Sequence, residues 1–339
     1  MRYKLLGNSG LRVAELCLGT MTFGTPGWGT DPGEAARIYA RYRELGGNFV
    51  DTANELYGGG RSEDVLGGLL AGHREDMVVA TKYSLALPGS ANPNLGGNHR
   101  KSLRRSLEAS LQRLGCDYVD LLWVHAWDRF TPLEEMMRAL DDLVRAGKVL
   151  YLGISNAPAW VVARCNSLAQ HNGWTPFVAL QLEYNLLERA IEQELLPMAG
   201  HFGLGVAAWS PLASGILSGK YGSDGQEARR LDQAQLKTVD ERGLAVAAAV
   251  GQVARELGRT PAQVALNWLR ARPGVIPLLG VRTFAQLEDN LGCLDFRLDD
   301  DTVARLSALT APAAQYPHDY LEKYRDIING GFYQRLDPD

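Results

Sequence analysis

The chain has 339 residues, of which 46% are hydrophobic and 22% are charged, and its formal net charge at pH 7 is −4. This composition is typical of a globular protein with a large core, and it excludes disorder as the main state. The mild acidity offers no overall basic surface to nucleic acid or to an anionic membrane. We interpret the densest basic stretch, 99–105, as the exposed face of a helix.

The cysteines and histidines give no sign of a disulfide framework or of a metal site. The four cysteines form no C-x-x-C pair, and the six histidines show neither H-x-H nor H-E-x-x-H spacing. The first residues lack the apolar segment of a secretory signal, and no apolar run approaches the about 18 residues of a membrane span. We therefore expect a soluble, cytoplasmic protein that holds no metal and binds neither nucleic acid nor membrane.

Short apolar segments alternate along the chain with longer segments of helical periodicity. The predicted strands are almost continuously apolar, which is typical of parallel strands buried on both faces, and they lie at 15–20, 48–53, 77–83, 118–125, 149–155, 178–184, 205–210 and 275–280. The predicted helices lie at 33–45, 62–71, 99–114, 132–146, 158–171, 189–202, 241–257 and 283–291. Start and stop signals support several of them, such as Pro32 and Pro132 in first turns and Gly147 after a last turn.

Eight pairs of strand and helix predict an α/β protein with the (β/α)8 architecture of a TIM barrel. A doubly wound sheet is the alternative, but its glycine fingerprint belongs in the first βα turn, and the turn at 19–24 does not match it. The segment 203–208 does match G-x-G-x-x-A, yet it precedes a strand instead of opening a helix. We predict a single barrel domain over residues 1–339, with 311–339 as a C-terminal tail over the barrel.

Polar side chains stand near the predicted carboxyl ends of successive strands, where barrel enzymes place their active sites. Asp51, Lys82 and His125 lie at the ends of the second, third and fourth strands, and Tyr57 follows the second. An ammonium beside a tyrosine favours its ionisation, so we expect Lys82 to lower the pKa of Tyr57 and Asp51 to keep Lys82 protonated. We expect His125 to hydrogen-bond a substrate carbonyl oxygen.

Each of these four residues also has an ordinary structural explanation, as an exposed charge, a helix cap, a packed histidine or a loop aromatic. We favour a catalytic role because the four converge, and a site is recognised by convergent roles. None of the four side chains can deliver a hydride. A carbonyl reductase built on them therefore needs a cofactor that carries one.

The sequence resembles the aldo-keto reductase superfamily over about residues 1–311, and more the bacterial and potassium-channel β-subunit branch than the aldose reductase branch. The resemblance is carried by strings that run in the family's order: Leu18-Gly-Thr-Met21, Asp51-Thr-Ala-Asn54, Tyr57-Gly-Gly-Gly-Arg-Ser-Glu63, Thr81-Lys-Tyr83, Asp120-Leu-Leu-Trp-Val-His125, Gly153-Ile-Ser-Asn156, Gln181-Leu-Glu-Tyr-Asn185, Trp209-Ser-Pro-Leu-Ala-Ser-Gly215, Leu279-Gly-Val-Arg282 and Gln286-Leu-Glu-Asp-Asn290.

The resemblance implies an NADP(H)-dependent oxidoreductase that reduces a small aldehyde or ketone, with Tyr57 as the general acid, Asp51 and Lys82 tuning it, and His125 orienting the carbonyl. It implies that the cofactor is held by Thr20, Met21, Asp51, Ser155, Asn156, Gln181, Trp209, Ser210, Pro211, Leu212, Ser214, Gly215, Lys220, Gly280, Arg282, Gln286, Asp289 and Asn290. Arg282 before a predicted helix N-terminus also suits a 2′-phosphate, which favours NADPH over NADH.

One departure from the family concerns the general acid. The family's tyrosine usually stands five residues after the aspartate, whereas Asp51 and Tyr57 are six apart in this sequence. A bulge in the loop would keep the hydroxyl in place, and a displacement by more than about 1 Å would impair catalysis. Tyr83 is the alternative acid, although strand alternation directs it away from Lys82.

Two further functions stay open from the sequence. The same site serves an alcohol or sugar dehydrogenase that runs the reverse reaction. The segment 209–221 also resembles the channel β subunits, so an NADPH-binding redox-sensing regulatory subunit is a competitor. An apolar wall for the substrate is expected from Trp28, Trp127 and the tail aromatics Tyr316, Tyr320 and Tyr324. The sequence does not predict the oligomeric state.

Overall fold

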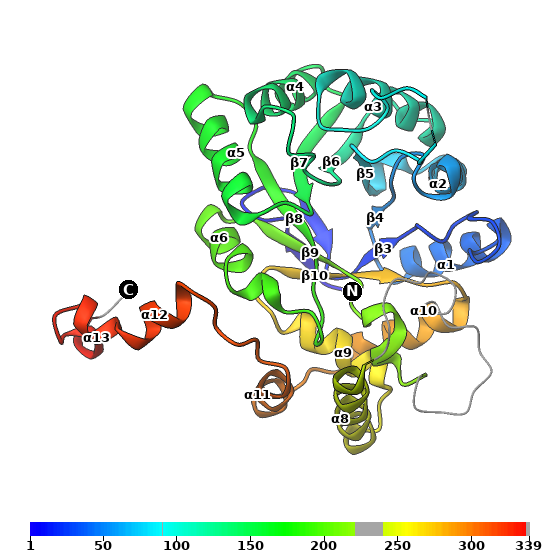
Figure 1. Cartoon of the computed structure of the whole chain (residues 1–339). Coiled ribbons are helices and arrows are strands. Elements are labelled where there is room, and N and C mark those ends of the chain that lie inside the picture. The colour runs from blue at the N-terminus through cyan, green and yellow to red at the C-terminus, as the bar shows by residue number, and fades with distance from the viewer. Residues whose placement is uncertain (90, 221–239, 337–339) are drawn as a thin grey trace.

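A computed structural model of the chain describes residues 1–89, 91–220 and 240–336. Its centre is a closed barrel of eight parallel strands, in the order β10-β3-β4-β5-β6-β7-β8-β9, which confirms the predicted (β/α)8 fold (Figure 1). The strands are β3 (Cys17–Gly19), β4 (Phe49–Asp51), β5 (Val78–Tyr83), β6 (Val119–Val124), β7 (Val149–Ser155), β8 (Phe177–Glu183), β9 (Gly205–Trp209) and β10 (Val275–Gly280). Seven of the predicted strands contain one of them, and the predicted strand 178–184 overlaps β8, which begins one residue earlier.

The barrel strands are apolar on both faces because each face packs against other side chains. The inward side chains fill the barrel with a small cluster that includes Phe49, Leu121 and Trp123. The outward ones join the larger core beneath the helices. A Cβ on Gly153 would lie 2.3 Å from the Trp123 ring, so only glycine at this position leaves room for that indole inside the barrel.

A layer of helices surrounds the barrel (Figure 1). These helices are α1 (Pro32–Glu44), α2 (Arg61–Leu70), α3 (Arg100–Leu114), α4 (Leu133–Arg145), α5 (Ala159–Asn172), α6 (Leu195–Phe202), α8 (Glu241–Leu257), α9 (Pro261–Arg270) and α10 (Phe284–Leu291). The start signal of α1 acts as expected, since the Asp31 side chain accepts hydrogen bonds from two backbone amides of the first turn, which Pro32 opens. Pro132 instead stands one residue before α4.

Several elements of the described chain were not predicted. The strands β1 (Tyr3–Leu5) and β2 (Arg12–Ala14) form a hairpin whose neighbouring Leu6 packs on the inner cluster, and Lys4 donates 2.7 Å to the Val275 carbonyl at the start of β10. The hairpin therefore lies at the amino ends of the strands, opposite the predicted site. The helices α9 and α11 (Asp300–Leu309) complete the outer layer next to α8.

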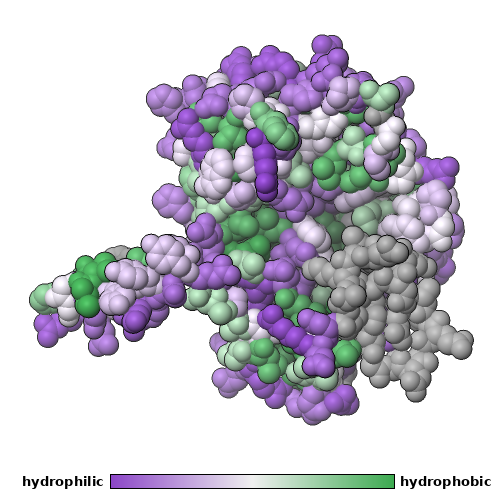
Figure 2. All heavy atoms as spheres, viewed as in Figure 1, coloured by the Kyte–Doolittle hydropathy of each residue, from purple (hydrophilic) through white to green (hydrophobic). Residues whose placement is uncertain are grey.

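The C-terminal tail does not lie over the barrel in this structure. After α11 the chain continues into α12 (His318–Lys323) and α13 (Arg325–Ile328), which lead away from the barrel (Figure 1). Apolar residues show on the projecting tail as well as around the centre of the barrel face in Figure 2. Residues 337–339 of the tail lie outside the described part. Among the described helices none is both long and apolar enough to cross a membrane.

Candidate active site

A buried ion pair stands at the carboxyl ends of β4 and β5. Lys82 is fully buried and donates hydrogen bonds to the Asp51 carboxylate and, over 2.6 Å, to the Thr52 carbonyl. Burial alone would lower the pKa of Lys82, but the charge of Asp51 and the neighbouring Tyr57 outweigh it and raise that pKa. Lys82 is therefore a fixed ammonium inside the barrel mouth at neutral pH.

Tyr57 approaches this ammonium from the loop after β4. The centre of its ring lies 5.1 Å from Lys82 Nζ. The extra residue between Asp51 and Tyr57 is absorbed in a tight turn, where the Tyr57 amide donates 3.1 Å to the Asn54 carbonyl. Asn54 anchors that turn, because its side-chain amide donates to the Leu85 carbonyl over 2.9 Å and to Ser106 over 3.1 Å. The turn thus brings the predicted acid beside the predicted ammonium.

His125 closes the group from the end of β6. Its ring is perpendicular to the Tyr57 ring, with the two centres 6.1 Å apart. Burial and then the charge of Lys82 lower the pKa of His125 to about 3, so the imidazole is neutral at physiological pH. Its buried Nδ1 has no hydrogen-bond partner among the residues that the structure describes. A neutral ring with an unpaired nitrogen at the barrel mouth is suited to a polar ligand.

Tyr83, the alternative acid, points out of the barrel. Its ring belongs to the outer core, its hydroxyl donates 3.4 Å to the Asn98 carbonyl, and burial raises its pKa far above that of a free tyrosine. The strand alternation that directs Lys82 inward directs Tyr83 outward. Tyr83 is therefore poorly placed to act on a substrate.

The three residues expected at the nicotinamide carboxamide lie together at the ends of β7 and β8. Ser155 Oγ donates 2.7 Å to the Gln181 carbonyl, and the Asn156 amide donates 2.9 Å to Ser155 Oγ. The Gln181 amide donates 2.9 Å to Asp51, which connects the group to the ion pair. Thr20 reaches the same place from the end of β3, because its amide donates 2.9 Å to the Asp51 carbonyl, and Met21 follows it.

The segment after β9, expected at the pyrophosphate, has an unusual backbone. Trp209 ends the strand, Pro211 is buried, and the chain then turns with positive φ at Ser210, Ser214 and Gly215. The Ser214 amide donates 3.1 Å to Ser210 Oγ and the Gly215 amide 2.9 Å to the Leu212 carbonyl. Lys220 is the last described residue of this segment.

The residues expected at the adenosine end lie after β10. Gly280 ends that strand and is exposed, and the Arg282 amide donates 2.9 Å to Gln286 Oε1 at the start of α10. Asn290 is buried in the same helix. Asp289 faces the helix layer instead, since the Gln263 side chain donates to both its carbonyl and its carboxylate.

The residues present fit NADP(H), for a reason visible in the backbone. Six non-glycine residues with positive φ occur in the described chain, and all lie in loops after β5, β6, β7 or β9: Ser84, Arg129, Asn156, Ser210, Ala213 and Ser214. Strained backbone of this kind gathers at ligand sites. Together with the unpaired His125 nitrogen and with Arg282 at a helix start, it supplies a polar rim of the kind a dinucleotide requires.

One buried set of side chains near the site was not predicted. Glu63, in the first turn of α2, accepts hydrogen bonds from Thr81 on β5 over 2.6 Å and from Arg113 on α3 over 2.7 Å. A glutamate at a helix start is ordinarily an exposed partner of the helix dipole, so the local pattern predicts an exposed Glu63 and not a buried ion pair. Its position beside the strand of Lys82 and the loop of Tyr57 is set by tertiary packing.

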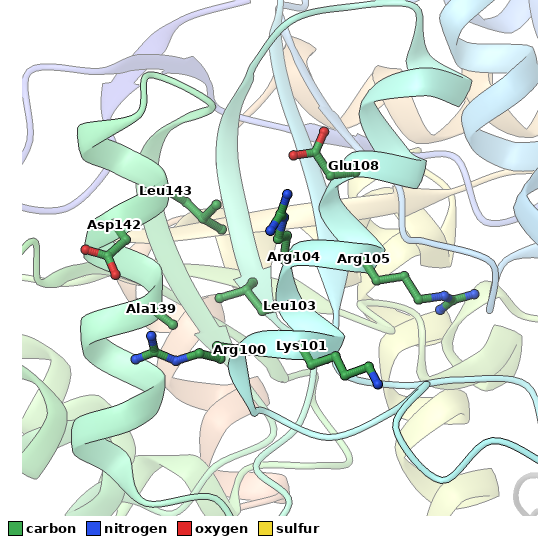
Figure 3. A pocket seen from close by; sticks show the side chains of 9 residues that line it. All are labelled: Arg100, Lys101, Leu103, Arg104, Arg105, Glu108, Ala139, Asp142 and Leu143. Carbon is green, nitrogen blue, oxygen red and sulfur yellow. The ribbon is translucent and has the colours of Figure 1, made fainter.

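The basic stretch predicted as an exposed helix face borders a hollow of about 590 Å³ between α3 and α4 (Figure 3). Leu103, Ala139 and Leu143 point into the gap, whereas Lys101 and Arg105 point away from it. Arg105 pairs with Glu55 over 3.4 Å. None of the residues that line this hollow belongs to the barrel mouth, so it is separate from the candidate site.

Comparison with known proteins identifies the family of this chain. The model of the aldo/keto reductase family matches residues 15–311. A norsolorinic acid reductase of Emericella nidulans is 39% identical over 334 residues, covering 94% of this chain and 84% of that protein. An NADP(+) aryl-alcohol dehydrogenase of Phanerodontia chrysosporium is 36% identical over 331 residues, covering 90% and 84%. The uncharacterized oxidoreductase YrpG of Bacillus subtilis is 37% identical over 334 residues, covering 94% and 99%.

Proposed function

The chain belongs to the aldo/keto reductase family and is an NADP(H)-dependent oxidoreductase that reduces carbonyl compounds, and we propose that Tyr57 is its general acid and an aromatic aldehyde or ketone its substrate. The observation that carries the proposal is the convergence of Asp51, Lys82, Tyr57 and His125 at one end of the barrel. Three of these side chains are buried and the fourth, Tyr57, lies with its ring centre 5.1 Å from the Lys82 ammonium.

The roles follow from charge and position. NADPH, when bound, supplies the hydride that none of the four side chains can provide. Lys82 stabilises negative charge at the Tyr57 oxygen, which makes Tyr57 a competent donor of a proton to the substrate oxygen. Asp51 keeps Lys82 charged and in place. Neutral His125 offers a ring nitrogen to the same oxygen and orients it.

The cofactor is assigned to the loops after β3, β7, β8, β9 and β10. Ser155, Asn156 and Gln181 hold the carboxamide and Trp209 stacks on the nicotinamide ring. The pyrophosphate is assigned to the turn after β9 and the adenosine end to the start of α10, with its 2′-phosphate at Arg282. The residues of the turn after β9 are Ser210, Pro211, Leu212, Ser214, Gly215 and Lys220, and those of the adenosine end are Gly280, Gln286 and Asn290. Thr20 and Met21 contribute from the loop after β3, whereas Asp289, which faces the helix layer, is left out of the set.

Aromatic side chains at the barrel mouth support an aromatic substrate. Trp127, two residues after His125, lies perpendicular to Trp160 with ring centres 5.3 Å apart. Phe130, on the same loop as Trp127, is 93% exposed. Such rings bind flat aromatic ligands well. The names of two relatives, a norsolorinic acid reductase and an aryl-alcohol dehydrogenase, point to the same class.

The cellular setting is also a proposal. The described cysteines Cys17, Cys116, Cys165 and Cys293 are all free thiols, and three are buried. Free thiols are typical of a reducing compartment. We therefore place the enzyme in the cytoplasm, where NADPH is available as a reductant.

The test is the loss of NADPH absorbance with a panel of aromatic aldehydes, aliphatic ketones and sugars, run in parallel with NADH. We expect turnover with NADPH, fastest with the aromatic aldehydes. Preference for a sugar or an aliphatic ketone would overturn the substrate class. Tight binding of NADPH without turnover on any member would overturn the proposed enzyme and favour the redox-sensing alternative.

A further inference from the structure

The side chain of Glu63 connects the loop that carries Tyr57 with the strand that carries Lys82. Lys82 stands on β5, and Tyr57 stands on the loop between β4 and α2, so the distance between them depends on how this loop packs against β5. Glu63 is fully buried at the start of α2, only six residues after Tyr57. It accepts 2.6 Å from the hydroxyl of Thr81, the residue directly before Lys82.

The other carboxylate oxygen of Glu63 holds Arg113 of α3. Arg113 Nε donates 2.7 Å to Glu63 Oε2, and Nη2 lies 2.6 Å from the same oxygen. The aliphatic part of Arg113 packs on Gly60, where a Cβ would lie 2.8 Å from Arg113 Cδ. Gly60 has a φ of 95°, and its amide donates 3.1 Å to the Tyr57 carbonyl. The Tyr57 loop therefore packs, through Gly60, against Arg113, and the Glu63 carboxylate holds the guanidinium of Arg113 in place.

Burial of the Glu63 carboxylate destabilises the fold unless hydrogen-bond donors and a cation compensate for the lost hydration. Burial raises the pKa of Glu63, and Arg113 and Thr81 act against that rise. Both oxygens have donors, and each donor belongs to a different element: one to the strand that carries Lys82 and one to the side chain that supports the Tyr57 loop. If Glu63 only filled space in the core, it would not have to contact both Thr81, on the strand of Lys82, and Arg113, which supports the Tyr57 loop.

We propose that Glu63 is a positioning residue, which, through Thr81 and Arg113, sets the spacing between the Tyr57 phenol and the Lys82 ammonium. The inference rests on the proposed role of Tyr57 and extends it. A looser spacing weakens the effect of the ammonium on the phenol and misplaces the proton donor. Loss of the connection should therefore lower kcat and move the alkaline limb of the pH profile upward, while cofactor binding is retained.

The chain offers a matched control for this pair. Asp141 on α4 is also buried and accepts from Arg145 over 2.6 Å and from the Thr175 hydroxyl over 3.0 Å. It has the same partner types as Glu63 but lies on the outer helix layer, and it contacts neither β5 nor the Tyr57 loop. Asp141→Asn therefore reports the cost of neutralising a buried, arginine-paired carboxylate as such.

The experiment compares Glu63→Gln, Thr81→Val, Thr81→Ser and Asp141→Asn with the wild type. The pH profile of kcat with an aromatic aldehyde, the Kd of NADPH and the Tm are measured for each. We expect Glu63→Gln and Thr81→Val to lower kcat about 10-fold or more and to shift the alkaline limb upward, with the Kd of NADPH within about twofold. Thr81→Ser, which keeps the hydroxyl, should restore both quantities, and Asp141→Asn should lower only the Tm.

A second readout separates failure of this inference from failure of the proposed function. Ultraviolet difference titration of the cofactor-free protein against its Tyr57→Phe counterpart reports the pH at which the Tyr57 phenol ionises, even without turnover. That pH should rise in Glu63→Gln and Thr81→Val. An unchanged ionisation in both variants, or a kcat and pH profile no different from those of Asp141→Asn, would overturn the positioning role.

Discussion

Lys82 Nζ lies 5.1 Å from the centre of the Tyr57 ring, and on its other side it donates a hydrogen bond to Asp51. The ammonium is fully buried between a carboxylate and a phenol. Coulombic attraction is strong in such a site because little water screens it. The arrangement therefore sets a positive charge beside the Tyr57 ring while the Asp51 charge holds the lysine in place.

Replacement of Lys82 by methionine should be strongly destabilising. The variant leaves Asp51 buried with Gln181 as its remaining side-chain donor, and breaking a buried pair typically costs about 3–5 kcal/mol. Urea unfolding measures the free-energy change. The double variant Asp51→Asn/Lys82→Met should regain much of that stability but none of the activity. Equal stability of the single and double variants would contradict the buried-pair interpretation.

The pH dependence should show no ionisation of His125 near neutrality. The pKa of His125 is lowered to about 3 in the folded protein, below the 6.5 of a free histidine. Its contribution to stability is therefore present above about pH 6.5 and is lost as the pH falls from there toward 3. Ionisation of His125 should therefore cause no change in the kcat/KM for carbonyl reduction between pH 5 and 7. An acid limb near pH 6.5 that disappears in His125→Gln would contradict the lowered pKa of His125.

Replacement of Arg282 by methionine should weaken the binding of NADPH more than the binding of NADH. A charge-assisted hydrogen bond to a phosphate is worth about 1.5–3 kcal/mol, so the Kd of NADPH should rise roughly 10- to 100-fold while that of NADH changes little. Fluorescence titration of both cofactors measures this. Lys101→Met, on α3, is the matched loss of one positive charge away from the site. If the Kd values of NADPH and NADH rise equally, Arg282 does not bind the 2′-phosphate.

Trp127→Leu should discriminate among substrates. Loss of an aromatic contact costs about 0.5–1.5 kcal/mol, so the KM for an aromatic aldehyde should rise by up to about tenfold, and the KM for an aliphatic ketone should rise less. Trp174→Leu, at a partly buried residue that packs against the outer core, serves as the control. If the two KM values rise equally, the indole of Trp127 does not select for aromatic rings.

The fold was predictable because the eight strands carry a strong signal. Strands buried on both faces are continuous apolar runs, as in 118–125, and helices between them are amphipathic. The helix α9 was not predicted although Thr260 and Gln263 form a capping box at its start, because the eight predicted helices already completed the (β/α)8 pattern. The hairpin of β1 and β2 has strands of only three residues each, too short for an alternation to stand out.

The proposed site was predictable only in part. Asp51, Lys82 and His125 follow from strand ends alone, since parallel strands bring their carboxyl ends to one rim. Glu63 and Arg113 are 50 residues apart, and their contact arises from the packing of α2 against α3, which no local pattern encodes. The course of the tail likewise depends on contacts beyond the sequence, such as the 3.1 Å hydrogen bond from Gln193 to the Ala313 carbonyl.

The most direct test of the proposed acid is the kcat of Tyr57→Phe with NADPH and an aromatic aldehyde. Removal of a general acid typically costs about 10²- to 10⁴-fold, so kcat should fall by this amount while the Kd of NADPH stays the same. Tyr83→Phe should retain wild-type activity. A Tyr57→Phe variant that keeps most of its kcat would contradict the assignment of Tyr57 as the proton donor.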